Sequence, residues 1–159
     1  MPAKNQAALD FLLTRRSRPA KTLTTPVPNA EELHVILTAA ARTPDHGKLE
    51  PWRFIVLEKE ALSRLAKDVP ARGAALNIDP EKIEKAIAQF ATADLAVAVI
   101  SSPKPSDKIP AIEQIYSAGA VCNAMVNAAL AAGWGANWLS GWMSHDRTFS
   151  EESFALTKD

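Results

Sequence analysis

The chain has 159 residues, of which 47% are hydrophobic and 23% charged, a composition typical of a single globular domain spanning residues 1–159. Lysine plus arginine and aspartate plus glutamate both number 18, so the formal net charge is zero, and no overall field favours nucleic acid or a membrane surface as partner. Cys122 is the only cysteine, which excludes an intramolecular disulfide, and the lack of a long apolar run or a signal-peptide pattern makes a cytoplasmic protein the expectation.

The first third of the sequence predicts two helices and a strand. Leucines at helical spacing predict a helix that starts near Asn5 and stops before Pro19. A capping box at residues 29–32 predicts the start of a second helix, which ends before Pro44. The run RFIVLE, residues 53–58, has the composition of a strand.

The middle of the sequence predicts two more helices and a second strand. Residues 62–66 mark a short helix, and Asp79 followed by Pro80 opens another, with proline at its first position. The run DLAVAVIS, residues 94–101, has the length and composition of a central strand buried on both faces. We expect the polar loop after it, residues 102–110, to be mobile.

The longest predicted helix spans roughly residues 111–132 and stops at Gly133. Its inner positions are alanine and glycine, which would let another helix approach closely. The run GANWLS, residues 135–140, predicts a third strand, and a last helix follows with a capping box at residues 148–151. Helices that alternate loosely with three strands indicate the α/β or the α+β class.

Most motifs that carry chemistry are absent. No GxGxxG follows a strand and no GxxxxGK[ST] occurs, so neither a Rossmann fingerprint nor a P-loop is present. The three histidines lie far apart and none belongs to HExxH, so we expect no metal site. Trp138 stands where a GxSxG motif around Ser140 would need its first glycine, which argues against a hydrolase. Cys122 lies among apolar residues and is expected to be an inert thiol.

The remaining candidate chemistry is cationic. Arg15, Arg16 and Ser17 end the first predicted helix, and Arg42 ends the second, with His46 four residues later. Cations near a helix C-terminus are favoured by the helix dipole, by about 0.3–1 kcal/mol each, which is one account of the cluster. The other account is an anion site, because guanidinium groups bind phosphate bidentately and a serine adds a neutral donor.

A second pair of accounts applies to Trp138, Leu139 and Ser140. In this Gly-flanked segment the three residues could form a flat apolar wall, with a few donors, beside a planar ligand. The alternative is that Trp138 is an ordinary core tryptophan.

Taken together, these stretches resemble the nitroreductase family of FMN-dependent NAD(P)H oxidoreductases, and in particular its short, single-domain bacterial members. The matching pieces follow the family's order over nearly the whole chain and are LLTRRSRP, ILTAAARTPDHGKLEPWRFIVLE, YSAGAVCNAMVNAALAAGWG and NWLSGW. The resemblance implies an α+β fold with a central mixed sheet flanked by helices. It also implies an intertwined homodimer with FMN bound at the subunit interface.

The resemblance further implies three groups of FMN contacts. The phosphate, the ribityl chain and the pyrimidine edge would be held by Arg15, Arg16 and Ser17. The cofactor of the other subunit would be reached by Arg42 and His46. The isoalloxazine ring would be lined by Trp138, Leu139 and Ser140. No catalytic side chain is implied, because the flavin supplies the redox chemistry.

The implied reaction is ping-pong: NADPH or NADH gives a hydride to FMN, which then reduces a nitroaromatic, a quinone or a related small-molecule acceptor. Other readings are another reaction on the same flavin fold, such as enone reduction or dehalogenation, and a protein that stores or senses flavin without turnover. A third is a small helical interaction domain whose arginines cap helices. Family members normally add a strand and a tail beyond the position of Asp159, so we expect the native chain to extend by roughly 20–30 residues. A form without that tail is expected to bind FMN weakly or not at all.

Overall fold

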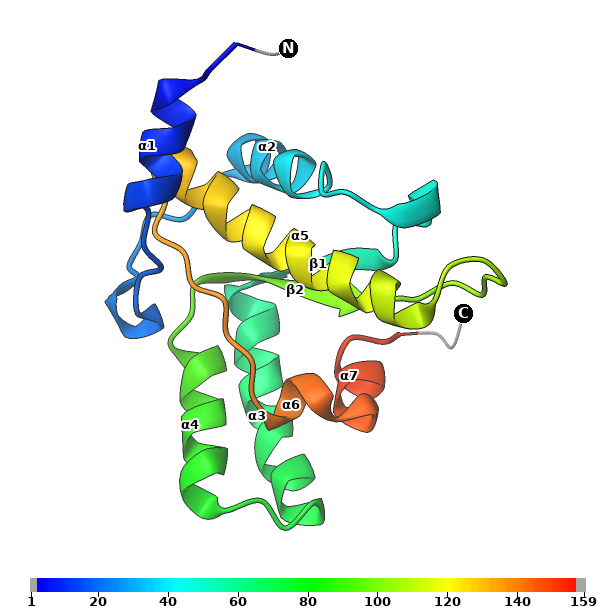
Figure 1. The fold of residues 1–159 in the computed structure, drawn as a ribbon. Coiled ribbons are helices and arrows are strands. Elements are labelled where there is room, and N and C mark those ends of the chain that lie inside the picture. The colour runs from blue at the N-terminus through cyan, green and yellow to red at the C-terminus, as the bar shows by residue number, and fades with distance from the viewer. Residues whose placement is uncertain (1–2, 157–159) are drawn as a thin grey trace. The chain divides into compact units, whose positions relative to one another are not determined.

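The computed structural model describes residues 3–156 (Figure 1). Their contacts divide the chain into two compact units. The first unit comprises Met1–Pro51 with Ser101–Trp138, and the second comprises Trp52–Ile100 with Leu139–Asp159. The expectation that residues 1–159 form a single domain stays a prediction.

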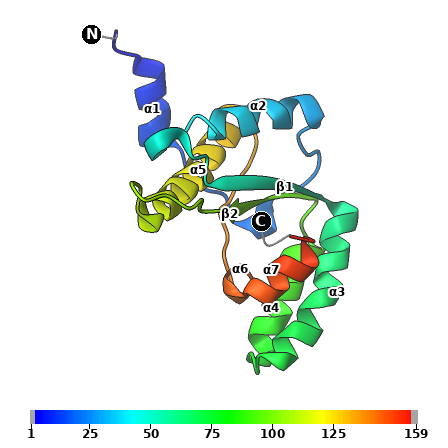
Figure 2. The same ribbon diagram turned by 90° about the vertical axis from the view of Figure 1, so that its right-hand side faces the viewer.

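The first unit is helical, and its core lies where α2 packs against α5, as Figures 1 and 2 both show. The predicted capping box is confirmed: Asn29 Oδ1 accepts from the backbone N–H groups of Glu31 and Glu32, and Glu32 Oε2 accepts from the Asn29 N–H at 2.9 Å. The long helix ends at Ala131, and Gly133 follows with a φ of +88°, as predicted for a C-terminal glycine. The helices of this unit are α1 (Gln6–Thr14), η1 (Ala20–Thr22), α2 (Ala30–Ala40), η2 (His46–Lys48) and α5 (Ala111–Ala131).

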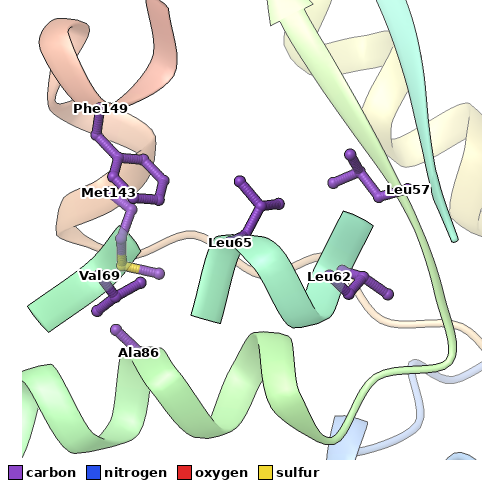
Figure 3. Close-up of a cluster of buried hydrophobic side chains, with 7 residues drawn as sticks. All are labelled: Leu57, Leu62, Leu65, Val69, Ala86, Met143 and Phe149. Atoms are coloured by element: carbon purple, nitrogen blue, oxygen red, sulfur yellow. The ribbon is translucent and has the colours of Figure 1, made fainter. Parts of the chain in front are cut away.

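The second unit holds the sheet and two long helices, α3 and α4, which pack side by side. The apolar side chains of α3 recur on one face and meet those of α4, α7 and strand β1 in a buried cluster (Figure 3). Its buried members are Leu57, Leu62, Leu65, Val69, Ala86, Met143 and Phe149. The elements of this unit are β1 (Trp52–Glu58), α3 (Lys59–Ala75), α4 (Pro80–Ala91), β2 (Leu95–Ser101), α6 (Trp142–His145) and α7 (Arg147–Ser153).

The sheet of the described residues consists of β1 and β2, which run antiparallel. At one end, the N–H of Ser102 donates to the carbonyl of Pro51 at 2.9 Å, so the end of β2 lies beside the start of β1. At the other end, Lys59 Nζ donates to the carbonyl of Ala93 at 3.0 Å. The strands predicted at residues 53–58 and 94–101 are confirmed as β1 and β2. The burial on both faces predicted for β2 is wrong. Its residues are half-buried or exposed, because β2 has a hydrogen-bonded neighbour on one side.

The third predicted strand, residues 135–140, is wrong: this segment has no regular structure. Its polar groups pair with the end of the arginine cluster instead of with a strand. The N–H of Arg18 donates to the carbonyl of Ala136 at 2.9 Å, and Asn137 Nδ2 donates to the carbonyl of Arg18 at 2.6 Å.

Two helix predictions for the second unit need correction. The helix expected to be short, around residues 62–66, is α3, and it continues past Pro70 because Val69 and Gly73 extend its buried face. The predicted capping box at residues 148–151 is wrong. Asp146 is the N-cap of α7, and its carboxylate accepts from the N–H of Phe149 at 3.0 Å. No helix within residues 3–156 combines the length and the apolar character needed to cross a membrane.

An ion pair joins α3 to the start of α7 within the second unit. The guanidinium of Arg72 donates twice to the carboxylate of Asp146, at 2.5 and 2.8 Å, in a bidentate arrangement. Asp146 therefore pairs with α3 and caps α7 at the same time. Nothing in the sequence pattern singled out this pair.

Candidate functional site

The arginine cluster follows α1 in an extended conformation. Arg15 is the C-cap of α1, and its Nη2 donates to Ser17 Oγ at 3.3 Å rather than to a carbonyl of the helix. Arg15 Nε is buried and has no hydrogen-bond partner among the described residues. A buried donor without a partner costs about 1–3 kcal/mol. Arg16 and Ser17 are exposed.

The irregular segment after α5 lies beside this cluster. The two hydrogen bonds between Arg18 and residues 136–137 fix the two segments to each other within the first unit. Gly135 packs against the Leu23 side chain, because a Cβ there would lie 2.7 Å from Leu23 Cδ2. Trp138 ends the segment with 54% of its surface exposed, and its ring edge lies over Gly119 of α5. The structure thus places the segment that carries Trp138 beside Arg18, the residue that follows the Arg15–Ser17 cluster. Trp138 is not an ordinary core residue.

Leu139 and Ser140 continue the chain from Trp138 into the second unit. Both are exposed, so each is accessible to a ligand. The wall predicted from these three residues is therefore an irregular, solvent-facing segment and not a strand.

Residues 43–50, which we call the clamp loop, carry an unusual backbone. Gly47, Lys48 and Glu50 have φ values of +74°, +55° and +48°. For the two residues other than glycine, such a conformation costs on the order of 1 kcal/mol each and persists only where the surroundings impose it. Within the loop, Asp45 Oδ2 accepts from the N–H of Glu50 at 2.6 Å.

The clamp loop contacts the start of α5 and the loop before it. His46 Nδ1 lies 2.7 Å from Glu113 Oε2, in the first turn of α5. Ile109 is buried against Gly47, where a Cβ would overlap the Ile109 side chain. Arg42 is exposed just beyond α2. No hydrogen bond within residues 3–156 joins Arg42 or His46 to the Arg15–Ser17 cluster.

The loop expected to be mobile, residues 102–110, has a buried anchor. The Gln114 side chain is 2% exposed, accepts from the N–H of Lys104 at 2.8 Å and donates to the Lys104 carbonyl at 2.9 Å. No sequence motif marks Glu113 or Gln114 as part of a site. The one signal available was their place in the first turn of a helix, and that signal does not reveal a contact with distant loops.

The second unit contains a cavity of about 300 Å³ that includes none of the predicted site residues. It is lined by Lys82, Lys85, Ala86, Gln89, Gly141, Trp142 and Met143.

Comparison with known proteins gives a family match: the model described as "Nitroreductase family" matches residues 12–155. Among curated proteins, the chain is 42% identical over 113 residues to a "Putative NAD(P)H nitroreductase" of Haemophilus influenzae. That match takes in 70% of this chain and 60% of the relative, so the chain spans less than two thirds of the relative's length.

Two solved structures share the fold. A nitroreductase-like family protein from Bacillus cereus superposes with a TM-score of 0.74 at 20% identity, over 99% of this chain and 81% of the other. A BluB-like flavoprotein from Clostridium difficile superposes with a TM-score of 0.71 at 17% identity, over 96% of this chain and 84% of the other. The nitroreductase-like α+β fold expected from the sequence is confirmed.

Proposed function

The chain belongs to the nitroreductase family, and we propose that it is an FMN-dependent oxidoreductase. In this proposal it takes a hydride from NADPH or NADH and reduces a nitroaromatic, a quinone or a related small molecule. The observation that carries the proposal is the Arg15 side chain, whose Nη2 donates to the Ser17 hydroxyl and whose buried Nε has no partner within residues 3–156. The names of the Haemophilus relative and the Clostridium neighbour, which mention NAD(P)H and a flavin, support it.

The residues present fit an FMN molecule. A phosphate dianion needs charge-assisted donors, which Arg15 and Arg16 supply, and the Ser17 hydroxyl adds a neutral one. A planar ring needs an apolar surface, which the exposed Trp138 and Leu139 supply, while Ser140 adds a hydroxyl. When bound, the flavin would supply the hydride-transfer chemistry. The residues of this chain bind and orient it, and none needs to act as a nucleophile.

The identity of the flavin tests the proposal. Flavin released by boiling the purified protein is expected to run on a column as FMN, because the chain has one compact cationic cluster and no dinucleotide fingerprint. A sample that is colourless as purified is first incubated with an equal mixture of FMN and FAD and then washed. A released flavin that is mainly FAD would contradict the assignment.

We further propose that the protein is a homodimer with two FMN sites at the subunit interface. The helices of the first unit leave large apolar side chains exposed, which is a feature of interaction surfaces when such side chains are numerous. Those on the helices are Leu9, Leu12, Leu13, Val35, Ile112, Ile115 and Tyr116. Arg42 and His46, which make no hydrogen bond to the Arg15–Ser17 cluster of their own chain, would reach the flavin held by the second subunit.

Mixing two defective variants tests the sharing of sites between subunits. After subunit exchange, Arg15→Ala and His46→Ala chains are expected to form heterodimers in which one site has both lesions and the other has none. After random exchange of equal amounts, half of the dimers are heterodimers and each has one intact site of two, so high-affinity FMN sites should recover toward about a quarter of the wild-type number. The matched control mixes Arg15→Ala with Arg16→Ala, where every site keeps one lesion and no recovery is expected. Equal behaviour of the two mixtures would show that the sites do not cross the interface.

A further inference from the structure

A short hydrogen bond joins the clamp loop to the start of α5. The 2.7 Å separation between His46 Nδ1 and Glu113 Oε2 is within the range of a charge-assisted hydrogen bond. A carboxylate only accepts, so the proton between the two groups belongs to Nδ1. The other ring nitrogen, Nε2, is then the atom of His46 that is left for a ligand.

The Glu113 carboxylate starts from a well-fixed backbone. The N–H of Glu113 donates to the carbonyl of Pro110 at 3.1 Å, which closes the first turn of α5. The next residue, Gln114, is buried and holds both backbone groups of Lys104. The fixed Glu113 carboxylate can therefore determine the orientation of the His46 ring.

The clamp loop requires such an external contact. Its left-handed residues Lys48 and Glu50 are unfavourable in isolation, and the loop keeps this shape through contacts to its surroundings. Besides the bond from the Glu50 N–H to Asp45 within the loop, the contacts to its surroundings include the packing of Ile109 on Gly47 and the bond of His46 to Glu113. His46 is the member of this set that a ligand could also contact.

We propose that Glu113 is a positioning residue for His46: it keeps the imidazole proton on Nδ1 and so presents Nε2 to the flavin held by the second subunit. This role rests on the proposed function, whereas the tautomer assignment stands on the structure of this chain alone. The His46–Glu113 pair is expected to add little to the free energy of unfolding. The two side chains are 63% and 46% exposed, and ion pairs of that kind contribute little to stability.

Nitrogen NMR of the full chain tests the inference, with and without FMN. The spectra are recorded at about pH 9, above the ordinary histidine pKa of about 6.5, so that the imidazoles are neutral. His46 is assigned from a His46→Gln variant. In the wild-type protein the His46 proton is expected on Nδ1. In Glu113→Ala it should move toward the Nε2–H form that an unpaired histidine prefers, and Glu113→Gln, whose amide oxygen still accepts, should restore the wild-type form.

Affinity for FMN provides the second arm. Glu113→Ala and His46→Ala are each expected to weaken FMN binding roughly three- to tenfold, the value of one hydrogen bond. The double variant should lose no more than either single variant, because both remove the same contact. The matched control is Glu84→Ala, an exposed glutamate of α4 that should change neither readout.

The outcomes separate the two claims. A wild-type tautomer in Glu113→Ala, or additive losses in the double variant, would overturn the positioning role. A tautomer change with no FMN binding by the wild-type chain would uphold the Nδ1 assignment and contradict the proposed function.

Discussion

Replacing Arg15 by alanine is expected to lower the affinity for FMN about ten- to a hundredfold and to leave the affinity for riboflavin almost unchanged. Riboflavin lacks the phosphate, so the difference between the two ligands isolates the phosphate contact. A charge-assisted hydrogen bond to a phosphate contributes about 1.5–3 kcal/mol, which corresponds to this range. Among the described residues, the hydrogen-bond partner of the Arg15 guanidinium is Ser17 Oγ, and Arg15 Nε has none. Quenching of flavin fluorescence on binding measures both dissociation constants.

Three further variants show whether the loss of FMN affinity depends on the position of the arginine or on its charge. Arg16→Ala is expected to weaken FMN binding to a similar degree, since Arg16 belongs to the same cluster. Arg15→Lys keeps the charge but loses the planar fork of donors, so an intermediate loss is expected. Lys21→Ala removes an exposed cation of η1 and serves as the control for net charge. Wild-type FMN affinity in both Arg15→Ala and Arg16→Ala would favour the helix-dipole account of the cluster.

Replacing Asp146 by alanine is expected to cause a loss of about 2–3 kcal/mol in the free energy of unfolding. The substitution removes the N-cap of α7, which contributes about 0.5–2 kcal/mol, and the charge-assisted bonds to Arg72, which link α7 to α3. A loss of this size is a large part of a typical stability of about 5–15 kcal/mol. Urea unfolding followed by circular dichroism measures it. Asp146→Asn keeps an acceptor for the Phe149 N–H and should lose less.

The effect of Asp146 depends on pH in a defined direction. The side-chain hydrogen bond from Arg72 is the main cause that lowers the pKa of Asp146 in the folded chain, and the Phe149 N–H adds to it, while burial opposes both. A depressed pKa means that the stabilisation is complete well above the unfolded value of about 3.9 and is lost as the pH falls through the folded value. The gap in stability between wild type and Asp146→Ala should therefore be full at pH 7 and narrow below about pH 4. A gap that stays constant down to pH 2 would contradict the charged pairing.

Local signals in the sequence predicted the parts of the fold that local interactions determine. The capping box of Asn29 and Glu32 predicted the start of α2, and Asp79 with Pro80 predicted the start of α4. Gly133 predicted the end of α5, because only a residue that tolerates a positive φ suits that position. These signals lie within a few residues of the feature that they predict.

Features that depend on contacts between distant residues were predicted wrongly or not at all. The segment 135–140 has the composition of a strand, yet its polar groups bond to Arg18, and no pattern in the segment itself shows this. The N-cap of α7 was placed at Thr148 because the spacing to Glu151 fits a capping box. The structure instead has Asp146 as the N-cap, and the guanidinium of Arg72 donates to its carboxylate.

The candidate site divides in the same way. Residue types and the family resemblance suggest Arg15, Ser17 and Trp138 as site residues, and Arg18 joins their two segments, while their role stays a prediction. Glu113 could not be predicted, because its relation to His46 exists only once the clamp loop lies against α5.

Anaerobic reduction tests whether this chain uses a bound FMN to transfer hydride equivalents. The FMN-loaded protein is mixed with NADPH or NADH while its visible absorbance is followed, and a nitroaromatic or a quinone is then added. We expect that at least one nicotinamide bleaches the flavin and that an acceptor restores the oxidised spectrum. A flavin that stays oxidised with both nicotinamides would contradict the account and favour a protein that stores or senses flavin.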